Sequence, residues 1–245
     1  MCKKLLFVFV IAITTVSCQF TETMVLNEDG SGRISISMDM KEMMAFGDMM
    51  DDSTKVRVDT IISMKDFLTE KQDSISTLSK AEQERLKKIE KFSFHTFMDP
   101  ETNEMYFDVF IDFKNIEEAD ELMNAFEGSG DFMQGMGSDT TVENDPSSGG
   151  MVAVKFKFKN GKFTRDAYIK DKAKHQVQMD SLKNAESFMG GMIYKLKYTF
   201  PRKIVKSSVD DARYSMDGRT IEIQRTFLEY LRDPDVLDLE IELEN

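Results

Sequence analysis

The chain has 245 residues but no tryptophan, only two histidines, two cysteines and four prolines. Its apolar run at residues 5–13 would rise about 14 Å as a helix, roughly half the hydrocarbon thickness of a bilayer. Because no later run approaches the ~18 residues that a span needs, the sequence predicts no membrane-spanning helix. The motifs HExxH, GxSxG, GxGxxG and CxxC are also missing, so no common catalytic or redox signature is present.

The charge balance is acidic, with 44 Asp and Glu against 32 Lys and Arg, and a formal net charge of −12. Such a surface repels nucleic-acid phosphates and anionic lipid headgroups. The basic stretches KVRV (55–58) and FPRKIVK (200–206) are short and flanked by acids. We therefore expect no nucleic-acid partner.

The first residues have the features of an export signal. Lys3 and Lys4 precede the short apolar run, and the small residue Ser17 comes directly before Cys18. The stretch TVSC (15–18) resembles the lipobox of bacterial lipoproteins, in which an aliphatic and two small or β-branched residues precede a cysteine. The resemblance implies that residues 1–17 are a signal peptide. It also implies that Cys18 receives a diacylglyceryl group on sulfur and an acyl chain, such as palmitate, on its new amine.

Cleavage before Cys18 would leave the mature chain with one cysteine, which cannot form an internal disulfide. Two or three acyl chains give stable anchoring, whereas one is marginal. We therefore expect a protein held in the cell envelope by the lipid on Cys18, on the periplasmic face or the cell surface. The alternative is an ordinary secreted protein with a stray cysteine.

The mature part alternates between strand-like and helical periodicity. Strand pairs are expected at 20–40, 92–113 and 152–169, and the Asp29-Gly30 and Asn160-Gly161 pairs suit their tight turns. Helices are expected at 41–50, 65–91, 116–126 and 170–189, followed by strands and a short helix over 192–243. The prediction is one α+β domain over 18–245. It has a largely antiparallel sheet built from hairpins, helices packed on one face, and a mobile loop near 128–150.

Methionine is frequent, with 19 residues. Its flexible thioether fills gaps in a core, and it also suits a deformable apolar surface that accepts a lipid tail or a partner. Core packing is the commoner role, but three clusters join methionine to phenylalanine and glycine near helix ends. The candidate ligand-binding residues are Met43, Met44, Phe46, Met49, Met50, Phe132, Met133, Met136, Phe188, Met189 and Met192.

Thioethers also suit Cu(I), but such sites usually recruit histidine or cysteine as well. His95 and His175 lie far from the clusters in the sequence, and Cys18 would be lipidated. We therefore expect no metal and no cofactor. His175 lies in a stretch rich in Lys and Gln and is expected to be exposed to solvent.

Two stretches resemble the LppM-like lipoprotein domain. MVLNEDGSGRISISMDM (24–40) has its strand, D-G-x-G turn and strand, and YTFPRKIVKSSVDDARYSMDGRTIEIQRTF (198–227) has its aromatic–proline step and a D-G turn. The resemblance implies an α+β domain at a membrane surface, with lipid or glycolipid binding and no catalytic group among the matching residues. The matching positions are Asp29, Gly30, Gly32, Phe200, Pro201, Asp217 and Gly218.

Three functions remain open at this point. The first is a membrane-anchored module, not an enzyme, that binds a lipid-like ligand or an envelope protein. The second is a structural or assembly factor that acts through sheet edges and its acidic surface. The third, a hydrolase, would need His95 or His175 gathered with carboxylates in a concave site.

Overall fold

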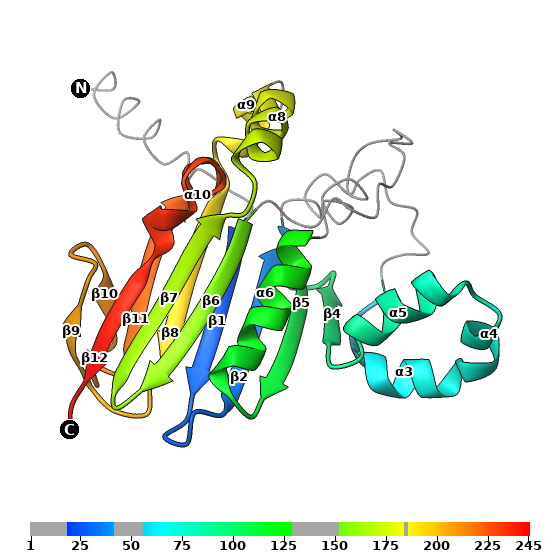
Figure 1. The fold of residues 1–245 in the computed structure, drawn as a ribbon, viewed down its shortest axis with the longest axis horizontal. Coiled ribbons are helices and arrows are strands. Elements are labelled where there is room, and N and C mark those ends of the chain that lie inside the picture. Colours follow the sequence, from blue (N-terminus) through cyan, green and yellow to red (C-terminus); the bar gives the residue numbers. More distant parts are fainter. Residues whose placement is uncertain (1–18, 42–55, 129–151, 184–185) are drawn as a thin grey trace, which may run out of the picture.

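The computed structural model describes residues 19–41, 56–128, 152–183 and 186–245, and it contains a larger and a smaller sheet (Figure 1). The larger has eight strands in the order β10-β11-β8-β1-β2-β5-β4-β3. Every neighbouring pair is antiparallel except β1 and β8, which are parallel. The strands are β1 (Gln19–Leu26), β2 (Gly32–Asp39), β3 (Val58–Ser63), β4 (Ser93–Asp99), β5 (Glu104–Phe113), β8 (Ile193–Thr199), β10 (Arg213–Tyr214) and β11 (Thr220–Thr226).

The smaller sheet is antiparallel, in the order β6-β7-β12-β9, and lies in front of the larger one in Figure 1. Helix α6 (Ala119–Gly128) extends this second layer beside β6. Asp120 accepts a hydrogen bond from the Phe156 backbone N–H at 2.8 Å, so a helix side chain satisfies part of the free edge of β6. The strands are β6 (Val152–Lys159), β7 (Lys162–Ile169), β9 (Ile204–Ser207) and β12 (Leu239–Leu243).

The core lies between the two layers. Alternate residues of β1 are buried, as the period of two in its sequence requires, and the same holds for β2, β8 and β12. Phe20 stacks on Phe227, which begins α10 (Phe227–Arg232), with ring centroids 4.7 Å apart. Each large side chain buried here contributes about 1.5–3 kcal/mol. The η4 turn (Ile116–Glu118) contacts β6, and the η6 turn (Pro234–Leu237) contacts β7.

The expected helical region 65–91 consists of three short helices that project from the β3–β4 edge (Figure 1). They are α3 (Met64–Glu70), α4 (Gln72–Ser76) and α5 (Lys80–Lys88). Helix α5 begins with a capping box, because the side chains of Ser79 and Glu82 each accept a hydrogen bond from the other's backbone N–H. Neither α3 nor α4 contains a buried residue.

Helices α8 (Lys172–Leu182) and α9 (Glu186–Met189) replace the single helix expected at 170–189 and lie above the sheets (Figure 1). The prediction that His175 is exposed is wrong. Its side chain is buried, and its Nε2 lies 2.7 Å from the Leu231 carbonyl oxygen. The Lys- and Gln-rich composition of the helix describes its outer face, whereas His175 lies on the face packed toward α10.

The α+β class and the largely antiparallel sheet are confirmed. The structure adds the second sheet, which the strand pattern alone does not separate from the first. The mobile loop predicted near 128–150 lies, from residue 129 on, outside the described residues. None of the helices described is long and apolar enough to cross a membrane.

Candidate functional site

One end of the sheets, called the upper end after its place in Figure 1, gathers several chain segments. It is defined by Gln19, which pairs with Asp39 on one side and Ile193 on the other, and by Met40, whose backbone N–H bonds the Met105 carbonyl at 2.9 Å. Strand β6 also begins at this end, because Val152 pairs with Ile169, the last residue of β7. The described residues next to Cys18 and next to segments 42–55 and 129–151 therefore lie together.

A hollow of about 550 Å³ lies on the outer face of the eight-stranded sheet, opposite the core. Its floor is polar, and it runs from β11 across β8, β1 and β2 to β5. Gln19, the residue after Cys18, is part of its wall. The lining residues are Gln19, Thr21, Thr23, Ser37, Asp39, Lys41, Glu104, Met105, Tyr106, Asp108, Lys195, Lys197 and Glu222.

Strand register orders the hollow into rows that cross the sheet. In the middle row, Lys195 pairs with Thr21, Thr21 with Ser37, and Ser37 with Asp108. The next row places Lys197 beside Thr23 and Ser35. Lys195 and Lys197, with Glu222 of β11 beside them, therefore form the β8 side, hydroxyl groups form the floor, and Asp39, Glu104 and Asp108, with Lys41 beside them, form the β2–β5 side.

The acidic side continues into a chain of polar contacts. Ser37 Oγ donates a hydrogen bond to Asp108 Oδ1. His95 follows on β4, with Nδ1 3.5 Å from Asp108 Oδ2 and Nε2 2.9 Å from Asp59 Oδ1 on β3. Burial raises the pKa of Asp108, and the facing His95 partly offsets this shift.

The contacts among Ser37, Asp108 and His95 do not form a Ser-His-Asp arrangement. The hydroxyl of Ser37 contacts the carboxylate of Asp108, whereas nucleophilic hydrolysis needs the imidazole next to the hydroxyl. Within the ranges that the structure describes, no group of three or more His, Cys, Asp or Glu side chains has the geometry of a metal site.

Directly beneath the hollow, β1 turns Glu22 into the core, where it meets Arg165 of β7. Arg165 Nη2 donates to Glu22 Oε2 at 2.9 Å and its Nε to Oε1 at 3.2 Å, and both side chains are fully buried. Tyr194 donates to Glu22 at 2.9 Å, and Tyr198 donates to its other oxygen. Burial, then the adjacent Glu22, raises the pKa of Tyr198 well above its usual value and keeps the donor protonated. The network joins the two sheets and fixes β1 under the hollow.

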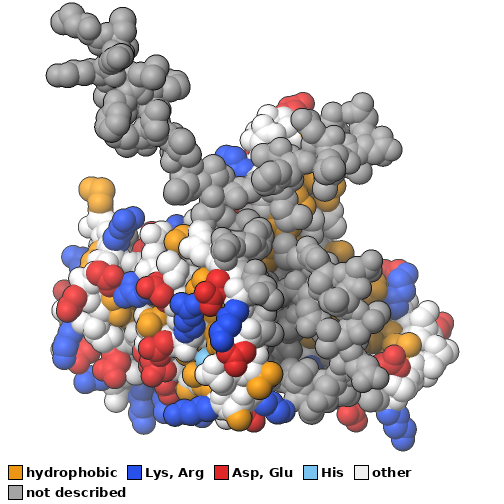
Figure 2. All heavy atoms as spheres, turned by 90° about the horizontal axis from the view of Figure 1, so that it is seen from above, with side chains coloured by type: hydrophobic (Ala, Val, Ile, Leu, Met, Phe, Trp, Pro, Cys, Tyr) orange, Lys and Arg blue, Asp and Glu red, His pale blue; other side chains and the backbone are white. Residues whose placement is uncertain are grey.

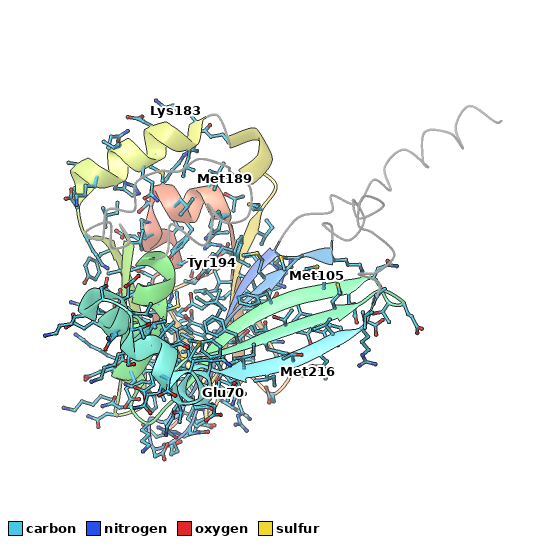
Figure 3. All side chains as sticks on the ribbon, turned by 90° about the vertical axis from the view of Figure 1, so that its right-hand side faces the viewer. Glu70, Met105, Lys183, Met189, Tyr194 and Met216 are labelled. Atoms are coloured by element: carbon cyan, nitrogen blue, oxygen red, sulfur yellow. The ribbon has the colours of Figure 1, made fainter. Side chains whose placement is uncertain are left out.

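The candidate methionines and phenylalanines are only partly described. Met189 and Met192 are buried in the core, and Figure 3 shows Met189 beneath α8 with Tyr194 further inside. Phe188 belongs to α9, and its side chain lies outside the described part. Segments 42–55 and 129–151, also outside it, hold Met43, Met44, Phe46, Met49, Met50, Phe132, Met133 and Met136. Their role in ligand binding stays a prediction.

Sequence reasoning missed the hollow itself. The alternation in IYKLKYT of β8 places Lys195 and Lys197 on one face, which was a usable signal. Nothing in the sequence showed that β8 pairs in parallel with β1, and this pairing brings the lysines beside Thr21 and Thr23.

No protein-family model matches the chain, and no curated protein is similar to it. Among solved structures, it is similar to the folded domain of the LppM protein of Mycobacterium tuberculosis, determined by NMR. The TM-score is 0.41 at 7% sequence identity, over 93% of this chain and 89% of that chain. This is the family that the stretches 24–40 and 198–227 resemble, and a likeness of this degree says nothing about ligands.

Proposed function

We propose that this chain is a lipid-anchored domain of the bacterial cell envelope that binds a lipid-like ligand at its upper end and is not an enzyme. Cys18, in its lipobox-like context, is the acylated residue. The observation that carries the proposal is the position of Gln19, which follows Cys18 and lines the hollow. Because consecutive Cα atoms are about 3.8 Å apart, acyl chains on Cys18 would start next to the hollow.

The methionine- and phenylalanine-rich segments support this orientation. Segment 42–55 leaves β2 after Lys41, which lines the hollow, and segment 129–151 ends where β6 begins, at the same end. The described residues that flank these segments, Lys41 and Val152, therefore lie at the same end as Gln19. Figure 2 looks onto this end and shows acidic and basic side chains interspersed over the described surface.

The anchor is tested by labelling growing cells with an alkyne analogue of palmitate. The wild-type chain and Cys2→Ser should carry the label, and Cys18→Ser should carry none. Cys2 is the matched control, because it lies in the segment that cleavage removes. Label that persists on Cys18→Ser would contradict the anchor.

Ligand binding is tested by native mass spectrometry of the mature chain after gentle extraction. A co-purifying lipid, released on unfolding, is the expected result. A chain whose mass shows only its own acyl groups would contradict a bound lipid-like ligand.

An assembly factor acting through protein contacts is the second candidate, and helices α3–α5 favour it. Phe67 of α3 and Leu78, between α4 and α5, are exposed, and a groove of about 620 Å³ between the helices holds Leu68, Ile75 and Leu86 among eight polar or charged residues. A photo-crosslinker placed at Phe67 should then trap one stoichiometric neighbour in cells. A diffuse pattern, equal to that from exposed Met216, would count against this function.

A further inference from the structure

Lysines outnumber carboxylates on the β8–β11 side of the hollow, and carboxylates outnumber lysines on its β2–β5 side. We propose that it binds the headgroup of a zwitterionic phospholipid of the phosphoethanolamine type. Lys195 and Lys197 hold the phosphate, and Asp39 with its neighbouring carboxylates holds the ammonium. This inference rests on the proposed function, because the acylated Cys18 is what places the hollow at a membrane surface.

The cationic side is formed by two lysines with few fixed partners. Lys195 and Lys197 alternate along β8, so both side chains leave the same face of the sheet. Lys195 Nζ lies 3.9 Å from Glu222 Oε1, which is the outer limit of an ion pair. Among the residues described, no carboxylate lies within ion-pair distance of Lys197. Both ammonium groups are therefore available to a phosphate, which lysine binds as a point charge.

The acidic side lies two to three strands away, on β2 and β5. Three strand spacings separate β8 from β5 by about 14 Å along the sheet. Asp108 is engaged by Ser37 and His95, whereas Asp39 is exposed, and one Asp39 oxygen accepts the Lys41 backbone N–H at 2.9 Å. Asp39 is therefore the carboxylate best placed to receive an ammonium.

The floor between the two sides consists of the hydroxyl groups of Thr21, Thr23 and Ser37. A hydroxyl both donates and accepts, so these groups suit the phosphodiester oxygens, whereas the two-carbon link between phosphate and ammonium needs no polar partner. Lys195 and Lys197 thus lie on one side of the hydroxyl floor and Asp39 on the other, as phosphate and ammonium lie at the two ends of the two-carbon link.

The charges favour a zwitterion over an anion. Three lysines and four carboxylates line the hollow, and the whole chain has a formal charge of −12. A phosphoglycerol headgroup would place its phosphate near the same lysines but would leave Asp39 facing an uncharged hydroxyl. Ethanolamine gives that carboxylate a counter-charge, so the acidic side acts as the discriminating element.

The test uses deacylated headgroups, titrated by calorimetry into the mature chain held in a maltoside detergent. Glycerophosphoethanolamine should bind more tightly than glycerophosphoglycerol or inorganic phosphate. Lys195→Gln with Lys197→Gln should weaken both phosphodiesters about tenfold, the scale of a lost charge-assisted contact. Asp39→Asn should weaken glycerophosphoethanolamine and strengthen glycerophosphoglycerol, a change of opposite sign that a loss of fold would not produce. Lys206→Gln, on exposed β9, is the matched control and should change neither.

Equal binding of the two phosphodiesters, or none of either, would overturn the proposal. So would inorganic phosphate binding as tightly as glycerophosphoethanolamine, or Asp39→Asn shifting both affinities in the same direction. Failure of the proposed acylation would be seen separately, because a chain without acyl groups would be recovered without detergent. The same titration of that chain would still measure headgroup binding in the hollow.

Discussion

Glu22 and Arg165 form a fully buried, bidentate ion pair that joins the two sheets across 143 residues of chain. The remaining acceptor capacity of Glu22 is used by Tyr194 and Tyr198, and Arg165 also donates to the Leu237 carbonyl at 3.1 Å. A pair with this many satisfied partners offsets the cost of removing two charges from water.

Neutralising one partner should therefore be costly. Glu22→Gln leaves the buried guanidinium of Arg165 without a counter-charge, and we expect the free energy of unfolding to fall by about 3–5 kcal/mol. Urea denaturation followed by circular dichroism measures the loss. Glu28→Gln is the control, because it breaks an exposed pair with Arg202 worth about 0–1 kcal/mol. Equal losses in the two variants would contradict a special role for the buried pair.

Asp120 should make stability depend on pH. Burial raises its pKa to about 6, although it accepts the Phe156 N–H. Because the folded state holds this proton more tightly than the unfolded chain, the stabilising contribution is present below the unfolded pKa and is lost as pH rises to about 6. Relative to Asp120→Asn, the wild type should lose stability as pH rises through this window and remain level above it. Parallel curves for the two proteins would contradict the shift.

The D-G-x-G turn has a packing requirement that can be tested. A Cβ added at Gly32 would lie 2.2 Å from the Val25 carbonyl oxygen and 2.6 Å from the Phe113 ring. Gly32→Ala should therefore cost about 1–3 kcal/mol through overpacking. Gly30→Ala is the comparison, since its cost comes only from a φ of +83° in open space and should be about 1–2 kcal/mol. Thermal unfolding would contradict the prediction if Gly32→Ala were the milder change.

Met189 tests whether the last methionine cluster is core or contact surface. Its side chain is 4% exposed, so Met189→Ala should lower the free energy of unfolding by about 2–5 kcal/mol through a lost contact and a cavity. Met216, at the exposed tip after β10, should tolerate alanine within about 0.5 kcal/mol. An equally mild effect at Met189 would favour a surface role.

The local structure could be predicted well from the sequence, because turn residues and alternation are local patterns. Asn160-Gly161 predicted the β6–β7 hairpin, and the structure shows positive φ at both residues. Alternation in FTETM also places Glu22 in the buried phase of β1, between Phe20 and Met24, which indicates a buried partner. That the partner is Arg165 depends on how two sheets stack, and no local pattern encodes this.

The hollow could not be predicted from the sequence for the same reason. Thr21, Ser37 and Asp108 come from three strands, and Lys195 joins them only through the parallel pairing of β1 with β8. Taken alone, each residue is ordinary for a solvent-facing position on a strand. Only the register shows that lysine, hydroxyl and carboxylate follow one another across the sheet.

The parallel β1–β8 pair also determines when the larger sheet can finish folding. β1 is made first, but one of its two neighbours is β8, which begins at Ile193. Until that strand has been synthesised, β1 has a free edge, and Glu22 has neither Tyr194 nor Tyr198. A fragment ending before Ile193 should therefore aggregate or be degraded, and the central sheet closes only when most of the chain has been made.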